Sequence, residues 1–370
     1  MGWRILRRGI IPLILILAAF TYWKLHPGAP RFVSVGHVAE RNVTLWNALA
    51  QVKQPLAVLH YGDRVEIMRE EGTTAEVRTA SGVVGWMTNS HQMMNSELWD
   101  ESAALLARAR KMPVQAVGRT NTISNVHIEP GRNSQRVFQF QRGTPVVILE
   151  RAAADVPQDE NASPANHQNP KQQEDWDLVL RSGETLPSEG IPDSAQNSTS
   201  PESQATSDSV SGGPGYLQSN VSASGLPAAP IAGWVLARFI DLDLPGPIRD
   251  YAGASDLHVQ AYFVLNRVPN GSGGEAPQYL VAATRGGGGQ PCDFTVLRVY
   301  TWSATQNRYE TAYTESNICG SMPIHVSQSP SGPEFRFAEA GNSGGERTYV
   351  MRQTMVRRLR SKDERRDKHR

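Results

Sequence analysis

The residues best suited to covalent chemistry lie around Cys292, one of only two cysteines in the chain. The stretch Gln290-Pro291-Cys292-Asp293-Phe294 places a thiol beside a carboxylate, and His325 is the candidate base that would remove the thiol proton. A nucleophilic thiol is activated well at the start of a helix. The residues from Phe294 to Trp302 alternate in polarity instead, which predicts a strand. The sequence around Cys292 therefore supplies a weak candidate nucleophile.

A disulfide between Cys292 and Cys319 is the structural alternative. Closing a loop of about 28 residues would contribute roughly 3 to 4 kcal/mol in the chain-entropy model. Such a bridge needs an oxidising compartment. Two free, buried thiols are the other possibility, and two cysteines are too few for a Cys-only zinc site.

The remaining chemistry-bearing residue types form no recognisable site. The nine histidines are scattered without metal-ligand spacing, and His91 with Met93-Met94 is best read as an ordinary loop end. The run Gly286–Gly289 is not followed by Lys-Ser/Thr, so it predicts a flexible turn and not a phosphate loop. We expect no metal, no cofactor and no catalytic residues.

Composition limits the function classes further. A chain of 370 residues has room for two or three domains, and its net charge of +1 argues against nucleic-acid binding. The charges occur in blocks, with nine basic and three acidic residues from Met351 to the end. Blocks of this kind are typical of solvated loops and tails.

The N-terminus predicts a membrane anchor. Arg4, Arg7 and Arg8 precede an uncharged stretch of fifteen residues, 9–23. As a helix it spans roughly 22 Å, and counting from Trp3 gives enough length to cross the bilayer. Basic residues before the apolar stretch place residues 31–370 outside the cytoplasm, on a single-pass protein of the inner membrane. The alternative is a cleaved signal peptide and a secreted or periplasmic product.

From Arg31 the sequence predicts two copies of one small β module. In each copy an Asn-Val pair, at Asn42 and Asn125, is followed by a glycine that begins a strand, Gly62 or Gly143. A closing Gly-Trp pair ends each copy. Alternate apolar residues of the glycine-led strands should face one core; they are Val65, Ile67, Val146 and Ile148.

This order of motifs resembles the bacterial SH3 (SH3b-type) domain family. The family pattern is an Asn-Val-Arg start, a Gly-x-x-Val strand, a Trp-x-x-Val strand and a closing Gly-Trp-Val. The resemblance covers roughly residues 31–94 and 113–245. The chain departs from the pattern at Thr44 and His127, which replace the arginine, and at Ala75-Glu76-Val77, where the family has a Trp strand.

The resemblance implies two small β-barrels that bind extended peptides or glycan-peptides through aromatic grooves. The predicted groove residues are Trp46, Tyr61, Phe138, Phe140 and Trp176. The predicted structural closures of the barrels are Gly85, Trp86, Gly233 and Trp234.

Two kinds of connecting segment are expected. Residues 96–111 have helical apolar periodicity, with basic residues at the C-terminal end, and predict a spacer helix. The second copy is about 67 residues longer than the first between its strand glycine and its closing Gly-Trp. Polar composition assigns this excess to disordered insertions at about 152–173 and 182–230.

The C-terminal part predicts an antiparallel β-meander, with Trp302 and Tyr309 flanking a hairpin turn. It resembles the C-terminal region that accompanies SH3 pairs in some membrane-anchored bacterial proteins, through the segments 278–281, 293–294 and 308–313. The predicted order is a membrane anchor or signal segment (1–30), a first SH3-like domain (31–94), a linker helix (95–112), a second SH3-like domain (113–245), a C-terminal β domain (246–356) and a basic tail (357–370).

The predicted protein is thus mainly β, with an N-terminal transmembrane helix, two SH3-like barrels and a C-terminal meander. The resemblance implies a non-catalytic envelope protein that binds peptidoglycan or a protein partner. A structural or assembly component without a small ligand is the alternative. SH3 modules also precede NlpC-type cysteine peptidases, and the residues around Cys292 resemble the nucleophile region of that family. Its order is Asp-Cys-Ser, whereas this chain has Cys292-Asp293-Phe294.

Overall fold

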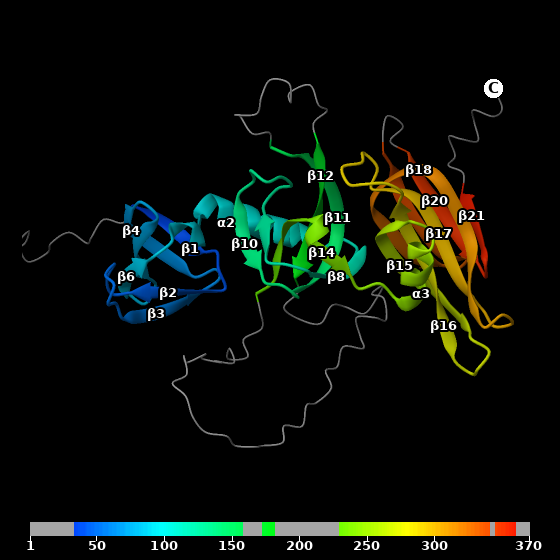
Figure 1. Ribbon diagram of the computed structural model, residues 1–370, viewed down its shortest axis with the longest axis horizontal. Helices are drawn as coiled ribbons and strands as arrows, with labels where there is room; N and C mark the ends of the chain where they lie inside the picture. The colour runs from blue at the N-terminus through cyan, green and yellow to red at the C-terminus, as the bar shows by residue number, and fades with distance from the viewer. Residues whose placement is uncertain (1–32, 158–171, 182–228, 341–344, 360–370) are drawn as a thin grey trace, which may run out of the picture. The chain divides into compact units, whose positions relative to one another are not determined.

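The computed structural model describes residues 33–157, 172–181, 229–340 and 345–359 (Figure 1). These residues are mainly β, as expected, with two α-helices and three seven-stranded antiparallel sheets. The chain divides into two compact units, Met1–Trp99 and Asp100–Arg370. The predicted anchor (1–30) lies outside the described residues, as do 158–171 and 182–228 of the insertions and 360–370 of the tail. No helix in the described part is long and apolar enough to cross a membrane.

The first sheet belongs to the first unit and has a core on one face. Its strands run in the order β3-β2-β6-β5-β4-β1-β7. Val65 and Ile67 are buried in one core with Leu45 and Met87, as their alternation predicts. The strands are β1 (Ser34–Val38), β2 (Asn42–Trp46), β3 (Pro55–His60), β4 (Arg64–Glu71), β5 (Thr74–Thr79), β6 (Val84–Met87) and β7 (Met93–Asn95), with a 3-10 turn, η1, at Ser90–Gln92.

The second sheet repeats this strand order. It runs β10-β9-β13-β12-β11-β8-β14, which is the first order with every number raised by seven. The repeated motifs in the sequence therefore correspond to a repeated topology. The strands are β8 (Ala116–Thr120), β9 (Ser124–His127), β10 (Arg136–Phe140), β11 (Pro145–Asp155), β12 (Gln173–Arg181), β13 (Ile231–Leu236) and β14 (Ile240–Leu242), with a 3-10 turn, η4, at Ala237–Phe239.

Each Gly-Trp pair lies where two strands distant in sequence meet. Trp86 of β6 pairs with Trp46 of β2, and Trp234 of β13 pairs with His127 of β9. The preceding glycines permit this close approach. A Cβ on Gly233 would lie 2.4 Å from Val126 Cγ1 and 2.8 Å from the carbonyl oxygen of His127, which is closer than carbon atoms pack.

The predicted spacer is helix α2 (Ser96–Ala109), two residues shorter than expected. The side chain of Asn95 accepts a hydrogen bond from the backbone N–H of Leu98 at 2.8 Å, which satisfies one of the free amides of the first turn. The helix ends ahead of the Met112-Pro113 pair that cannot continue it.

The expected insertion boundaries are wrong by several residues. β11 continues to Asp155, and Ala152–Asp155 pair with Gln173–Trp176 of β12. Small alanines and a continuous ladder of backbone hydrogen bonds extend this hairpin, although its composition resembles that of a loop. The second sheet therefore carries a long β11–β12 ribbon.

The third sheet is an uninterrupted meander in the order β15-β16-β17-β18-β19-β20-β21, following a short helix, α3 (Gly246–Gly253). Its longest strand, β18, runs without interruption from Arg308 to Ser329. Trp302 pairs with Tyr309 across the predicted hairpin. The strands are β15 (His258–Pro269), β16 (Glu275–Thr284), β17 (Phe294–Ser303), β18 (Arg308–Ser329), β19 (Gly332–Glu339), β20 (Glu346–Arg352) and β21 (Met355–Leu359).

The last strand corrects the start of the basic tail. Val350 pairs with Arg357 and Thr348 pairs with Leu359, so residues 357–359 belong to β21. Pairing with β20 supplies the backbone partners that these charged residues could not supply alone.

Candidate binding sites

Cys292 is not a free thiol, because it forms a disulfide with Cys319. The bridge joins the loop before β17 to β18, so the disulfide alternative is confirmed and the alternative of two free thiols is wrong. Phe294 begins a strand and not a helix, and His325 is exposed on β18. The cysteine-peptidase hypothesis therefore loses both its nucleophile and the helix that would activate it.

Three of the five predicted groove aromatics belong to the core. Phe140 is fully buried, and Phe138 and Trp176 are each 2% exposed. Both phenylalanines lie on β10, where the guanidinium of Arg181 covers their rings at 4.9 and 5.5 Å from the ring centroids. They stabilise the second sheet and are not available as an open groove.

The other two predicted groove residues, in the first unit, are half-buried. The Nζ of Lys53 lies 4.4 Å from the ring centroid of Trp46, close enough for a cation–π interaction. The ring of Tyr61 lies 5.7 Å from that of Trp99. The structure does not bring Trp46 and Tyr61 together with the other three.

Trp176 nevertheless lines a cavity of about 340 Å³ on the second sheet, here called the second-sheet cleft. The buried indole contributes one wall, and the exposed Ile123 and Phe239 of η4 add apolar surface. The polar lining comes from His127, Arg132 and Arg238, with the amides of Asn125 and Gln139.

Among the described residues, positive charge exceeds negative charge at this cleft. One carboxylate, Glu174, bonds to Arg132 at 2.5 Å and to Arg238 at 2.6 Å. Hydrogen bonding to Arg132 is the main cause that lowers the pKa of Glu174, so this carboxylate is ionised at neutral pH. Two guanidiniums share it, and both remain about half exposed.

His127 contributes no charge to the cleft at neutral pH. Burial lowers the pKa of its imidazole below the ordinary value. The ring packs edge-on against Trp176, with centroids 5.2 Å apart, and its Nδ1 lies 2.8 Å from the carbonyl oxygen of Ser134. The cleft thus has apolar walls, a neutral imidazole and two guanidiniums at its mouth.

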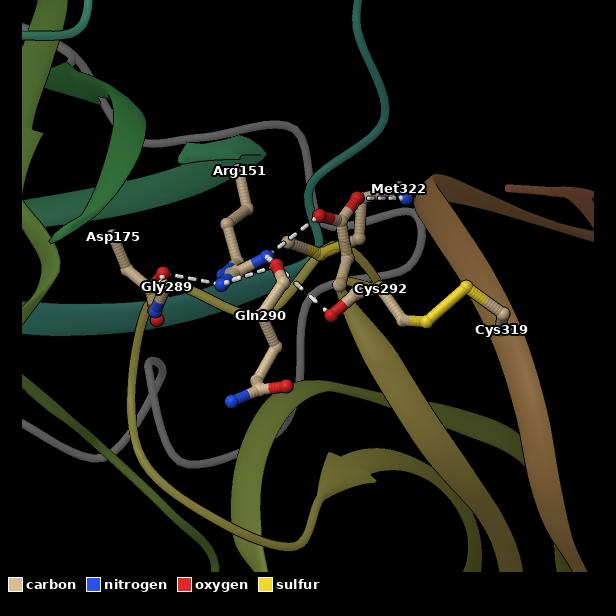
Figure 2. A network of polar contacts seen from close by, with 8 residues as sticks. Arg151, Asp175, Gly289, Gln290, Cys292, Cys319 and Met322 are labelled. Atoms are coloured by element: carbon tan, nitrogen blue, oxygen red, sulfur yellow. Dashed lines mark hydrogen bonds and ion pairs between the residues drawn. A yellow bond between two sulfur atoms is a disulfide. The ribbon is translucent and has the colours of Figure 1, made fainter. Parts of the chain in front are cut away.

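A second group of polar residues surrounds Arg151 of β11, whose side chain is only 3% exposed (Figure 2). Its guanidinium bonds to Asp175 of β12, and to Asp293, just before β17, at 2.9 Å. Carbonyl oxygens of Gln290 and Cys292 accept further hydrogen bonds from it, at 3.3 and 3.5 Å.

The two carboxylates of this network are themselves held by backbone amides. Gly289 donates to Asp175 at 2.6 Å, and Met322 donates to Asp293 at 2.7 Å (Figure 2). The glycine run that predicts a flexible turn is therefore fixed against a carboxylate. The network joins β11 and β12 of the second sheet to β17 and β18 of the third.

Gln115 makes a second connection between these sheets. Its side chain is fully buried, accepts a hydrogen bond from the backbone N–H of Ile324 at 2.7 Å and donates to the carbonyl oxygen of Ile324 at 3.2 Å. The backbone carbonyl of Gln115 accepts from Tyr262. Buried, fully paired polar groups of this kind fix the relative position of two packed elements.

Next to the network lies a cavity of about 500 Å³, here called the interface cavity, between β12 and η4 on one side and β15, β16 and the glycine run on the other. Asp175 and Asp177 line it on the same face of β12, two residues apart. Thr284 and His258 approach from the third sheet. Burial is the main cause that raises the pKa of Asp177, to about 7.

Sequence reasoning missed Arg151, Asp177 and Thr284. A usable signal was present in Asp175-Trp176-Asp177, where two carboxylates interrupt a strand that is otherwise apolar toward its C-terminal end. Charged residues in a buried strand are rare unless they are paired, so they mark a site or an interface. No cluster of three His, Cys, Asp or Glu side chains suited to a metal ion occurs in the described ranges.

Comparison of the chain with protein-family models, with curated proteins and with solved structures finds no match.

Proposed function

We propose that the chain is a non-catalytic binding protein of the bacterial cell envelope, anchored by residues 9–23. It displays two SH3-like barrels and a C-terminal β domain outside the cytoplasm. The barrel built on the second sheet binds peptidoglycan through the second-sheet cleft.

The cleft is the observation that carries this proposal. Its walls of Trp176, Ile123 and Phe239 suit the apolar parts of an extended peptide. Arg132 and Arg238 share one carboxylate, so their remaining N–H groups can donate hydrogen bonds to a second carboxylate, supplied by a ligand. A planar guanidinium binds a carboxylate through two parallel hydrogen bonds, and the stem peptides of peptidoglycan carry carboxylates.

The Cys292–Cys319 disulfide supports an extracytoplasmic location. Disulfides persist in the periplasm and outside the cell and are rare in the reducing cytosol. This agrees with the orientation that the N-terminal arginines predict.

Co-sedimentation of the purified chain with isolated peptidoglycan tests the proposal. The test variant is Ile123→Asp, which places a negative charge on an exposed wall of the cleft, where Ile123 is 56% exposed. The matched control is Val58→Asp, at an apolar residue of β3 that is 53% exposed in the first unit. Both sites are open to solvent, so neither change should prevent folding.

We expect the wild type and Val58→Asp to pellet with the wall at low and moderate salt. Ile123→Asp should bind about tenfold more weakly, which corresponds to about 1.4 kcal/mol. If the wild type stays in the supernatant at both salt concentrations, peptidoglycan is not the ligand. If Val58→Asp loses binding and Ile123→Asp retains it, the first unit carries the site.

A further inference from the structure

The interface cavity has an excess of negative charge. Glu174, Asp175, Asp177 and Arg238 line it, and Arg151 with Asp293 lies behind them, so four carboxylates face two guanidiniums. Besides burial, the charges of Asp175 and Asp293 both raise the pKa of Asp177. Arg151 bonds to Asp175 and Asp293. Asp177 lies opposite Arg151 in the ladder, yet its carboxylate receives no hydrogen bond from it.

Two polar side chains in the lining, those of Asp177 and Thr284, make no hydrogen bond within the described residues. Asp177 is 8% exposed and its carboxylate receives no hydrogen bond within the described part of the chain; it is attracted electrostatically by Arg151. The hydroxyl of Thr284, a residue that is 7% exposed, is buried and likewise lacks a hydrogen-bond partner there. Leaving such a group without a hydrogen bond is unfavourable, and more so when the group is charged. Both residues line the same cavity, so one ligand there can contact both.

The rest of the lining defines the class of ligand. Ile148, Leu236, Ile240 and Leu242 give the cavity an apolar side that a hydrated metal ion would not use. An anion would be repelled by Asp175 and Asp177. An apolar chain that ends in a positively charged amine satisfies both the carboxylates and the apolar surface.

We propose that the interface cavity binds an alkylammonium group, with Asp177 as its counter-ion and the Thr284 hydroxyl as a further acceptor. The ligand is a small amine or a lysine-like side chain of a larger one. The interface cavity adjoins the second-sheet cleft and shares Leu236 and Arg238 with it, but the excess charge of the cleft has the opposite sign. The proposal stands whether or not the chain binds peptidoglycan.

The test is a calorimetric or NMR titration of the full chain with n-pentylammonium. The uncharged probe of matched shape is 1-pentanol. We expect pentanol to bind about ten- to hundredfold more weakly, because it lacks the charge-assisted hydrogen bond to Asp177. Asp177→Asn should weaken pentylammonium binding by a similar factor, whereas Asp250→Asn, at an exposed carboxylate of α3, should leave it unchanged.

The pH dependence provides a second readout. A bound cation favours ionised Asp177, so wild-type affinity should rise between pH 6 and pH 8. The other ionisable groups at the cavity are Glu174, Asp175, Arg238 and His258, with Arg151 and Asp293 behind them. Protonated His258 would also repel the probe, so His258→Gln should retain the pH dependence and Asp177→Asn should remove most of it.

Three results would overturn the proposal. The first is equal affinity for pentylammonium and pentanol. The second is full wild-type affinity in Asp177→Asn. The third is no saturable binding of pentylammonium by the wild-type chain at pH 8. Thr284→Val gives an independent check, because it keeps the size of the side chain and removes the acceptor; we expect a smaller loss, of about threefold.

Discussion

The first and second sheets have one strand order and two patterns of burial. In the first, β6 alternates between exposed or half-buried and buried residues, whereas all six residues of the corresponding β13 are buried. β4 buries two residues, and β11 buries four in succession, Val146–Leu149. The first sheet also exposes large apolar side chains, among them Leu56, Val58 and Val84.

The difference in burial depends on whether another sheet packs against the outer face of the copy. The second sheet packs in one unit with the third, through Gln115 and the Arg151 network, so both faces of its central strands are covered. The two copies therefore share a strand order but differ in the side chains on the sheet face that lies away from the core. A buried arginine with several carboxylates occurs only in the copy that has a covered outer face, within the described residues.

Removing Arg151 should have the largest effect on this comparison. Arg151→Ala leaves Asp175 and Asp293 buried without their counter-ion, which should lower the unfolding free energy of the second unit by about 3 to 5 kcal/mol. The matched change in the first sheet is Arg78→Ala, which removes a partly exposed pair with Glu66 and should cost less than about 1 kcal/mol. Calorimetric melting of each variant measures both effects, and equal losses would refute the distinction.

Removing the disulfide should have the next largest effect on stability. Cys292→Ser with Cys319→Ser removes a cross-link across a sequence separation of 27 residues and should destabilise the second unit by about 3 to 4 kcal/mol. The first unit contains no cysteine, so its melting transition should not move. A shift of both transitions in a calorimetric scan would show that the units do not unfold separately.

Substituting the two closing glycines should also destabilise the second sheet more than the first, but by less than the changes above. A Cβ at Gly233 would lie 2.4 Å from Val126 Cγ1, whereas a Cβ at Gly85 would lie 3.0 Å from the carbonyl oxygen of Trp46. Gly233→Ala should therefore lower the unfolding free energy by about 1 to 3 kcal/mol, as overpacked cores do. Gly85→Ala should have a smaller effect in parallel urea titrations, and the reverse order would contradict the packing described for the second sheet.

The last effect concerns the pH dependence of stability and is measured per pH unit. Burial raises the pKa of Asp177 to about 7 from an ordinary value of 3.8, so between these pH values the folded chain binds the proton and the unfolded chain does not. Stability from this group is therefore full below about pH 4 and falls as the pH rises to 7, with a slope of at most about 1.4 kcal/mol per pH unit.

Asp177→Asn removes that contribution, and the difference between variant and wild type isolates it from the other ionisable groups. Urea unfolding at several pH values between 4 and 8 gives the measurement. Parallel curves for the two proteins would show that Asp177 titrates normally.

The sequence predicted the parts of the fold that depend on local patterns. The repeated order of an Asn-Val pair, a glycine-led strand and a Gly-Trp pair predicted the repeated topology. The two strand-like segments on either side of the turn between Trp302 and Tyr309 predicted the hairpin. Composition placed the insertion boundary too early at Ala152, because residues of low β-propensity are paired there by the partner strand β12.

The candidate sites were less predictable because they form between segments distant in sequence. Arg151 meets Asp293 across 142 residues, and no local pattern connects them. Phe138 and Phe140 are predicted as groove residues because aromatic side chains occur both in grooves and in cores, and only the packing distinguishes the two.

Amide hydrogen exchange of the full chain, comparing wild type with Arg151→Ala, tests most directly whether the second and third sheets form one unit from which the first is independent. If they do, exchange in β11, β12 and β17 should be faster in the variant, with β4 and β5 unchanged. Faster exchange in β4 and β5, or faster exchange confined to β11 and β12 while β17 keeps its protection, would show that they do not.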